Sequence, residues 1–433
     1  MRSPREEPMH RPAQGGALRE RLRSPWVLGA LALGLGLRLS FGLAARTVGR
    51  EDRIVHLDGW GDVAVHVLEG RGFSLDGETP SAVRGPAFPL ALAAFYRAFG
   101  ISRATVILFQ SLADTLTGVL MVFLGCRLGL SRRATVFGLV LWALYFPHLY
   151  YTNVAMSEPF FTVCLMLAVA LLSRTPWPRR HELVLSAVAM GVATLVRPVA
   201  ALFAAAVAGL RRPGMPRGGL RWRIVYLAVF CATLAPWAVR NHARFGHFLW
   251  GSTFGGYAAY SAVYRIDEPD YVPAWHVDLQ DAVGRFEAEM RLRGWDPARM
   301  SEYDRNAEAI RLSRAKAASR PWRYARLVVD NFMRMMFCVY DFSFHSWRNA
   351  AVAGLNAVIY GLFALGVAAR ARAPGAWDPR WTLLVGIVLI NTAAYSSVYA
   401  ISRYNNPMIP LFLLVAGAGV QALSRRTEAG PRP

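Results

Sequence analysis

Long apolar runs recur along almost the whole chain, and they are the feature that most restricts its fold. A helix needs about 20 apolar residues to cross a bilayer, and these runs are long enough to do so. The chain has 433 residues, of which 54% are hydrophobic, whereas a soluble chain of this length would contain far fewer such runs. We therefore predict an all-α integral membrane protein with about ten transmembrane helices. The predicted spans cover roughly residues 26–45, 104–125, 134–151, 155–173, 183–197, 199–210, 222–242, 351–369, 382–400 and 407–424.

The distribution of arginine supports this number of spans and predicts their orientation. The positive-inside rule requires basic residues in every second connection if the N-terminus is cytoplasmic. Arginines cluster in 2–23, 127–133, 174–180, 211–223, 370–380 and 425–426, which alternate in this way. The other connections are tight turns with few charges or two long loops that mix arginines with acids. We therefore predict a multi-pass protein of the inner (plasma) membrane with both termini in the cytoplasm.

This topology divides the chain into five regions. The predicted regions are a cytoplasmic tail (1–25), a transmembrane core (26–242) that includes a catalytic first outer loop (46–103), an extracytoplasmic helical loop (243–350), C-terminal transmembrane helices (351–424) and a second cytoplasmic tail (425–433). Residues 277–318 have the pattern of small solvent-exposed helices. Residues 327–347 are apolar but contain Asp330, Arg334 and Asp341, and a span there would invert every later loop. We predict that they form a juxtamembrane helix at the outer interface.

The net charge of +21 is carried almost entirely by arginine, and Lys316 is the only lysine. A nucleic-acid-binding protein would place its arginines along one soluble face, but here many lie in the short turns between apolar runs. No nucleic-acid partner is therefore expected. The four cysteines show no paired spacing, and no His, Asp and Glu cluster has metal-ligand spacing, so neither a metal nor another cofactor is predicted.

The first outer loop contains the acidic residues that are best placed for chemistry. Asp58, Asp62 and Glu69, together with His66, are spaced so that a helix would carry them on one face. The residues on the opposite face are apolar: Trp60, Val63, Ala64, Val67 and Leu68. This pattern predicts an amphipathic helix at the membrane surface with its acidic side toward water. Asp58 and Asp62 are the candidate catalytic residues, and simple solvation of that helix is the alternative role for both.

Further polar residues lie near the outer ends of the predicted spans, where burial is costly and a functional role is the default expectation. The candidate substrate-binding residues are Arg84, His148, Glu158, Arg197, Arg240, Arg403 and Tyr404. Each also has a structural alternative. Glu158 follows Ser157 and could cap a helix, Arg197 and Arg240 could extend to the lipid headgroups, and Arg403 with Tyr404 could anchor the last helix. His148 fits a hydrogen-bonded polar residue better than a metal ligand.

Several short segments, taken in order, carry a family resemblance over most of residues 26–424. These segments are DGWGDVAVHVLEGRGFS, VRGPAFPLALAAFYRAFG, YFPHLYYTNVAMSEPFF, GVATLVRP, APWAVRNHARFG with GSTFGGY, and ISRYNNPMIP. They resemble the polyprenyl-phosphate-sugar-dependent glycosyltransferases of the GT-C fold, the branch that includes aminoarabinose transferases and protein O-mannosyltransferases (glycosyltransferase family 39). Two features depart from the family pattern. Trp60 stands where many relatives have tyrosine, and Asp58 lacks the adjacent second acid, so the principal acid is either Asp58 or Asp62.

The resemblance implies an enzyme that moves a sugar from a polyprenyl-phosphate donor in the membrane to an extracytoplasmic lipid, glycan or protein acceptor. The residue types suit that reaction, because a carboxylate can deprotonate the acceptor while arginines bind the departing phosphate. Attack in line with the leaving group would invert the anomeric carbon. A polytopic transporter or lipid flippase is the alternative, but it would be expected to show internal repeats and polar residues at the bilayer midplane. A structural scaffold would not explain arginines at the outer ends of spans.

Overall fold

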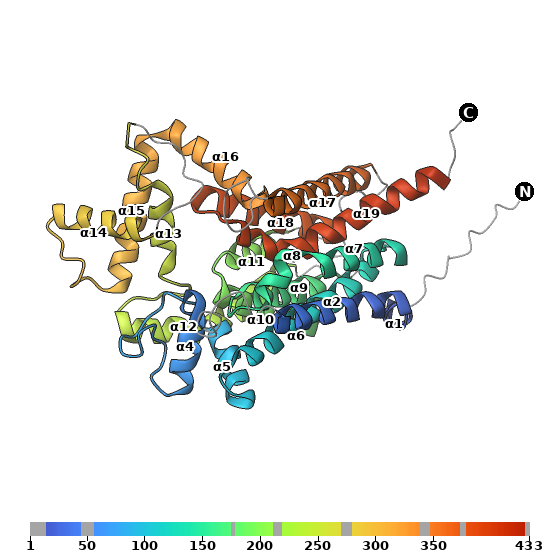
Figure 1. Cartoon of the computed structure of the whole chain (residues 1–433), viewed down its shortest axis with the longest axis horizontal. Coiled ribbons are helices and arrows are strands. Elements are labelled where there is room, and N and C mark those ends of the chain that lie inside the picture. Colours follow the sequence, from blue (N-terminus) through green and yellow to red (C-terminus); the bar gives the residue numbers. More distant parts are fainter. Residues whose placement is uncertain are drawn as a thin grey trace, which may run out of the picture.

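The computed structural model describes residues 14–44, 56–174, 178–210, 219–269, 279–337, 347–372 and 378–428. Within these ranges all regular secondary structure is helical, apart from one isolated β-bridge between Ser74 and Pro80. The predicted all-α class is therefore confirmed. Long helices such as α17 (Trp347–Ala371) run along the molecule, and α1 (Gln14–Leu22) lies at the same end as the C-terminus of α19 (Ile409–Glu428) (Figure 1).

Six helical stretches in the described part of the chain are long and apolar enough to cross a membrane. They are α2 (Pro25–Ala44), α6 (Arg103–Arg127), α12 (Gly219–Phe245), Asn349–Ala371 within α17 (Trp347–Ala371), α18 (Pro379–Val398), and Ser402–Ser424, which joins the 3-10 helix η2 (Ser402–Met408) to α19. The other predicted spans coincide with shorter helices: α7 (Arg132–Leu144) with α8 (Phe146–Tyr151), α9 (Glu158–Leu172), α10 (Arg180–Val196) and α11 (Ala200–Gly209).

The range 134–151, predicted as one span, is broken near its C-terminal end. α7 ends at Leu144, Tyr145 is extended with φ −69° and ψ 102°, and α8 begins at the next residue. The break follows from Pro147, because proline has no N–H to donate and its ring disfavours a preceding helical turn. The turn buries Tyr145, whose hydroxyl donates a hydrogen bond of 2.9 Å to Oδ1 of Asn356 on α17.

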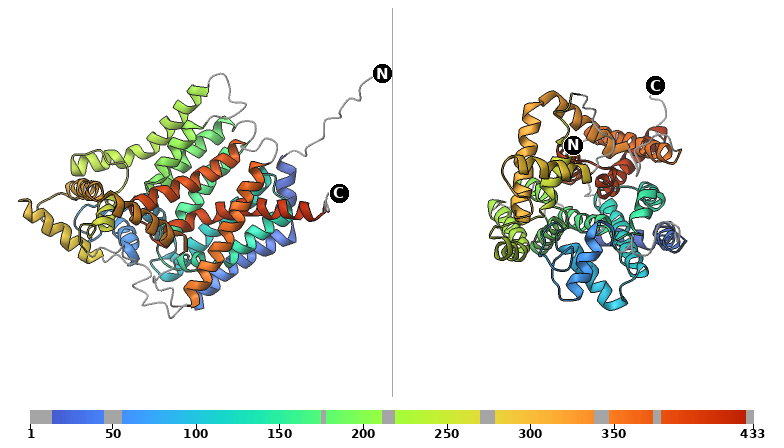
Figure 2. Two further views of the ribbon diagram at one scale, coloured as in Figure 1. Left: turned by 90° about the horizontal axis from the view of Figure 1, so that it is seen from above. Right: turned by 60° about the vertical axis from the view of Figure 1, so that its left-hand side comes forward.

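Small residues allow the long helices to pack closely. α17 packs along α19, and α9 packs against both α6 and α10. At Gly366 on α17, an added Cβ would overlap the carbonyl oxygen of Val415 on α19. Such small-residue contacts are typical of helices that associate in a membrane, where backbones approach closely. Figure 2 shows this bundle from two further directions.

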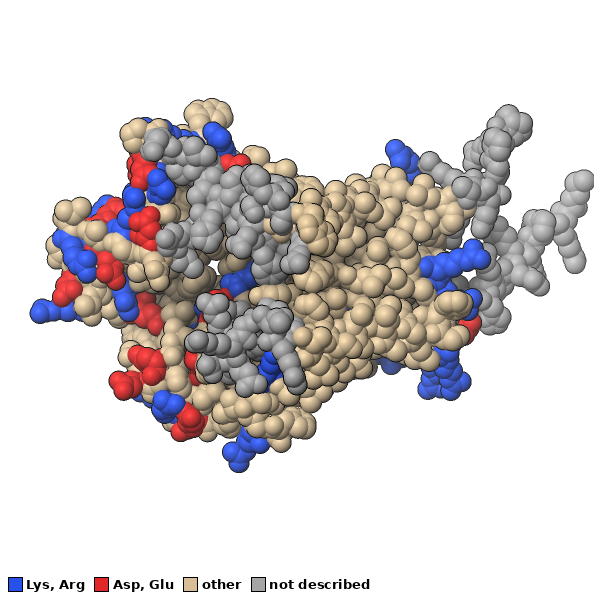
Figure 3. All heavy atoms as spheres, viewed as in Figure 1, with Lys and Arg blue, Asp and Glu red and all other residues tan. Residues whose placement is uncertain are grey.

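Surface charges gather at the two ends of the molecule on the face that Figure 3 shows. In the view of Figure 3, acidic and basic residues crowd one end, basic residues predominate at the other, and the band between them is uncharged. The mixed end contains α4 (Trp60–Leu68), α13 (Phe254–Val263), α14 (Leu279–Leu292) and α15 (Glu302–Ser319). The expected small helices over 277–318 are thus present, and they share a separate core of Tyr260, Phe286, Met290, Ala309 and Leu312.

The juxtamembrane helix predicted over 327–347 is represented by α16 (Pro321–Phe337), and 338–346 lie outside the described residues. α16 packs against α17, α18 and η2 with one face. Its other face is exposed and largely apolar, with Trp322, Val329 and Met333 on it. An amphipathic helix of this kind is suited to an interface between lipid and water.

Candidate functional site

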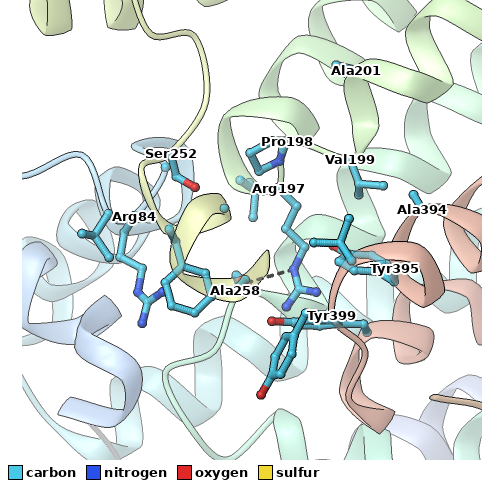
Figure 4. A pocket seen from close by; sticks show the side chains of 18 of the residues that line it. Arg84, Arg197, Pro198, Val199, Ala201, Ser252, Ala258, Ala394, Tyr395 and Tyr399 are labelled. Atoms are coloured by element: carbon cyan, nitrogen blue, oxygen red, sulfur yellow. Dashed lines mark hydrogen bonds between the residues drawn. The ribbon is translucent and has the colours of Figure 1, made fainter. Parts of the chain in front are cut away.

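A cavity of about 350 Å³ lies at the mixed-charge end of the bundle, where loops and helix ends from six parts of the chain meet. Its polar lining consists of Asp58, Arg84, Ser157, Arg197, Ser252, Tyr395, Tyr399, Arg403 and Tyr404. Much of the remaining wall is apolar and comes largely from residues 196–202, 250–258 and 394–398. Arg84, Arg197 and Tyr399 enter from three different elements (Figure 4). A cavity of this size with a few convergent polar groups is typical of a ligand site.

Asp58 is held in the cavity by an unusual backbone turn. Its φ of 58° and ψ of 16° are left-handed, and Gly59 follows with φ 72°. Aspartate tolerates this conformation better than most residues, and such strained positions concentrate at functional sites. Arg84 supports the turn, because its Nε donates a hydrogen bond of 2.7 Å to the Asp58 carbonyl oxygen. The prediction of a single helical face carrying Asp58 and Asp62 is therefore wrong, since α4 begins only at Trp60.

Glu158 lies behind the cavity wall and links two arginines that line it. Its carboxylate is 3% exposed, with Oε1 2.7 Å from Nη2 of Arg197 and 3.7 Å from Nε of Arg403. Nη1 of Arg403 in turn lies 2.7 Å from Oδ2 of Asp58. Glu158 is also the first residue of α9, where the helix dipole favours a negative charge. The chain Arg197–Glu158–Arg403–Asp58 therefore connects three regions that are far apart in the sequence.

Aromatic rings orient the arginines further. The guanidinium of Arg84 lies 5.2 Å from the ring centre of Trp60 and 5.0 Å from that of Phe254. That of Arg197 lies 5.3 Å from the ring of Tyr404. Cations are attracted to aromatic faces at these distances, so each guanidinium is kept in a limited set of orientations. Trp60 thus serves as a platform for Arg84.

The charges of the site favour an anionic ligand. Three arginines (Arg84, Arg197 and Arg403) and two carboxylates (Asp58 and Glu158) leave a formal charge of +1. Burial alone would raise the pKa of Asp58, but the positive charges of Arg403, Arg84 and Arg197 outweigh this effect and hold that pKa below its ordinary value of 3.8. Burial lowers the pKa of Arg84, and the Asp58 carboxylate opposes that change. Asp58 is consequently ionised in the free protein.

Four predicted site residues do not line this cavity, namely Glu158 behind its wall and Asp62, Arg240 and His148. The carboxylate of Asp62 pairs with Nδ1 of His56 and does not line the cavity. Arg240 does not line it either, and two of its nitrogens donate to main-chain carbonyls, Nη1 to Ser81 at 3.0 Å and Nη2 to Phe73 at 3.2 Å. Arg240 therefore secures the loop between α4 and α5 (Ala87–Phe99).

His148 belongs to a different buried cluster. Its Nε2 lies 3.0 Å from the Asn406 carbonyl oxygen, and its Nδ1 lies 3.4 Å from Oδ1 of Asp114. Asp114 also pairs with Arg38, which lies 4.0 Å from the ring centre of Trp142. This cluster is enclosed among α2, α6, α7 and α8, and it contacts η2, the element that carries Arg403. In the described part of the chain, no three His, Cys, Asp or Glu side chains gather as metal ligands would.

Several residues of the cavity and of the buried cluster were not predicted. Arg38 and Asp114 could have been found, because each is a charged residue inside an apolar run. Ser252, Tyr395 and Tyr399 have no comparable signal, since hydroxyl and aromatic residues are common at the ends of membrane helices. Their place in the site follows from contacts between distant segments.

The fold and the cavity define an all-helical membrane protein with an arginine-rich site at one end of its bundle. No known family model and no curated protein matches the chain. It is similar to a crystal structure of ArnT from Cupriavidus metallidurans bound to undecaprenyl phosphate, at 15% identity and a TM-score of 0.39, over 94% of this chain and 79% of that one. It is also similar to ArnT from the same organism in the apo state, at 14% identity and a TM-score of 0.40, over 92% and 78% of the two chains.

Proposed function

We propose that this protein is a membrane glycosyltransferase that transfers a sugar from a polyprenyl-phosphate donor to an extracytoplasmic acceptor. The observation that carries the proposal is the convergence of one carboxylate, Asp58, and three arginines in a largely apolar cavity. The ordered motifs of the sequence support the same reaction class. The end of the molecule opposite the basic end is the extracytoplasmic side by the positive-inside rule.

The arginines are suited to bind the phosphate of the donor. Arg84, Arg197 and Arg403 all line the cavity, and guanidinium groups match the geometry of phosphate oxygens. The negative charge of the phosphate increases as the bond to the sugar breaks, so these charges stabilise the transition state more than the bound donor. Leu202 and Val398 line the cavity and are 49% and 42% exposed. They suit the passage of a polyprenyl chain from the cavity to the surrounding lipid.

Asp58 is the proposed general base. Its carboxylate takes the proton of the acceptor hydroxyl or amine, the freed electron pair attacks the anomeric carbon, and the bond from that carbon to the phosphate oxygen breaks. The phosphate leaves with the bonding electrons, and the configuration at the carbon is inverted. In the free protein Arg403 partly neutralises Asp58. A phosphate that takes over Arg403 therefore leaves Asp58 a stronger base in the complex.

Replacement of each aspartate by asparagine tests this assignment, because asparagine keeps the shape and removes the basicity. General-base assistance contributes about 10²–10⁴-fold in rate, so Asp58→Asn should lose most transfer activity and still bind undecaprenyl phosphate. Asp62→Asn is the matched control and should lose far less, since Asp62 faces His56 outside the cavity. Both variants are assayed in the same membranes, with the acceptor found by glycan analysis of a deletion strain. Normal transfer by the Asp58 variant would refute the mechanism.

A further inference from the structure

Ser81 and Ala82, which immediately precede Val83 and Arg84, form hydrogen bonds with three segments that lie far away in the sequence. The hydroxyl of Ser81 and the amide of Ala82 donate to the two carboxylate oxygens of Glu302, each at 2.8 Å. The carbonyl oxygen of Ser81 accepts from Arg240 at 3.0 Å, and that of Ala82 accepts from the amide of Thr253 at 3.0 Å. The Ser81 hydroxyl, the Ala82 amide and the carbonyl oxygens of both residues are thus bonded to Glu302 of α15, Arg240 of α12 or Thr253, the residue before α13.

Glu302 connects this dipeptide to another part of the cavity wall. Its carboxylate also accepts a hydrogen bond from the hydroxyl of buried Thr253, which immediately precedes α13. The next residue, Phe254, lines the cavity and lies against Arg84. One turn further along α15, Oδ1 of Asn306 accepts from the amide of Gly256 at 2.7 Å. The first turns of α15 therefore hold both Arg84 and the aromatic ring beside it.

The other side of Arg84 abuts α10. An added Cβ at Gly85 would overlap the carbonyl oxygen of Leu195, near the end of the helix that Arg197 follows. A glycine is required here because the two backbones approach too closely for any side chain. Arg84 is consequently fixed between α10 and the contacts made by Glu302, and its position relative to Arg197 depends on both.

We propose that Glu302 is a positioning residue for Arg84, so that α15 supports the phosphate site from outside the cavity. This inference rests on the proposed function. Glu302 does not line the cavity, and it acts through the Ser81–Ala82 dipeptide and Thr253. Its chemistry is specific, because all three partners are donors and an ionised carboxylate is a pure acceptor. A glutamine of nearly equal size would direct its amide group at one of these donors.

Binding of undecaprenyl phosphate to the full chain in detergent is the first readout. Glu302→Gln removes a hydrogen bond to a charged group and should thereby displace Arg84. We expect the affinity for undecaprenyl phosphate to fall by about tenfold or more. In an Arg84→Ala background the same substitution should add less than about twofold, because the contacts of Glu302 converge on Arg84 and on Phe254, the ring that lies against it. Glu308→Gln on the same helix is the control, since Glu308 pairs with Arg311 of α15 itself. Equal losses in both backgrounds would overturn the proposal, as would unchanged binding by Glu302→Gln.

Hydrogen exchange of peptides covering residues 81–86 is the second readout, and it separates this proposal from the proposed function. Faster exchange there in Glu302→Gln, without change in α9, supports the positioning role of Glu302. This holds even if the wild-type protein fails to bind undecaprenyl phosphate, a result that would refute only the proposed function. Unchanged exchange of these peptides in Glu302→Gln overturns the positioning role of Glu302. If Glu302→Gln does not fold, the pair Thr253→Ser and Thr253→Val replaces it, because only serine retains the hydroxyl. Equal binding by these two variants overturns the proposal.

Discussion

Substitution of Glu158 by glutamine removes one buried charge and leaves the shape of the side chain unchanged. Oε1 of Glu158 lies 2.7 Å from Nη2 of Arg197, and two unit charges at that distance attract by about 6 kcal/mol at an effective dielectric constant of about 20. Desolvation of both ions offsets much of this attraction. Removal of one partner of a buried pair still costs about 3–5 kcal/mol, because the other charge is left without compensation. We expect Glu158→Gln to lower the free energy of unfolding by this amount and to impair transfer.

The assay is equilibrium unfolding in mixed detergent, followed by helical circular dichroism. Glu287→Gln is the matched control, since Glu287 lies 3.1 Å from Arg291 but the two side chains are 36% and 63% exposed. An exposed pair of this kind contributes about 0.2–1 kcal/mol, so the control should unfold almost as the wild type does. If Glu158→Gln differs from the wild type by no more than the control, Glu158 does not act as the buried anchor of the two arginines.

Two further predictions concern the geometry and the ionisation of the site. Gly85→Ala should reduce binding of undecaprenyl phosphate at least tenfold, because its Cβ must push the chain that carries Arg84 away from α10. Gly284→Ala on α14 is the control, since an added Cβ there meets open space and the backbone conformation is an ordinary one. The low pKa of Asp58 keeps the carboxylate charged as pH falls, so kcat/KM should stay level down to about pH 5 and decline only below the ordinary value of 3.8. The acid limb of the kcat profile should lie at higher pH than that of kcat/KM, because bound phosphate competes with Asp58 for Arg403 and so raises the pKa of Asp58. Identical acid limbs would show that Arg403 does not exchange partners.

The parts of the fold that could be predicted from the sequence are those that depend on local composition. An apolar run forms a helix in a membrane because its backbone groups can be satisfied only within the segment, whatever its neighbours are. The alternating arginine clusters are equally local. The break at Tyr145 could also have been predicted, because Pro147 interrupts an otherwise apolar stretch.

The connections within the site could not be predicted in the same way. Glu158 meets Arg197 and Arg403 only after α9, α10 and η2 have packed together, and no spacing in the sequence records that contact. The left-handed turn at Asp58 is a similar case. Regular helical spacing suggested that Asp58 continues α4, whereas the hydrogen bond from Arg84 to its carbonyl oxygen holds it outside the helix.

Arg240 and Arg403 show why an arginine near the end of a span does not by itself identify a phosphate site. Both follow apolar sequence, and both were predicted to bind substrate. Arg240 donates to two main-chain carbonyls, which are bound to the fold and cannot leave when a ligand arrives. Arg403 faces two carboxylates, and a phosphate can replace Asp58 while the guanidinium keeps an anionic partner. The nature of the partner, rather than the position of the arginine in the sequence, therefore determines which of the two is available to a ligand.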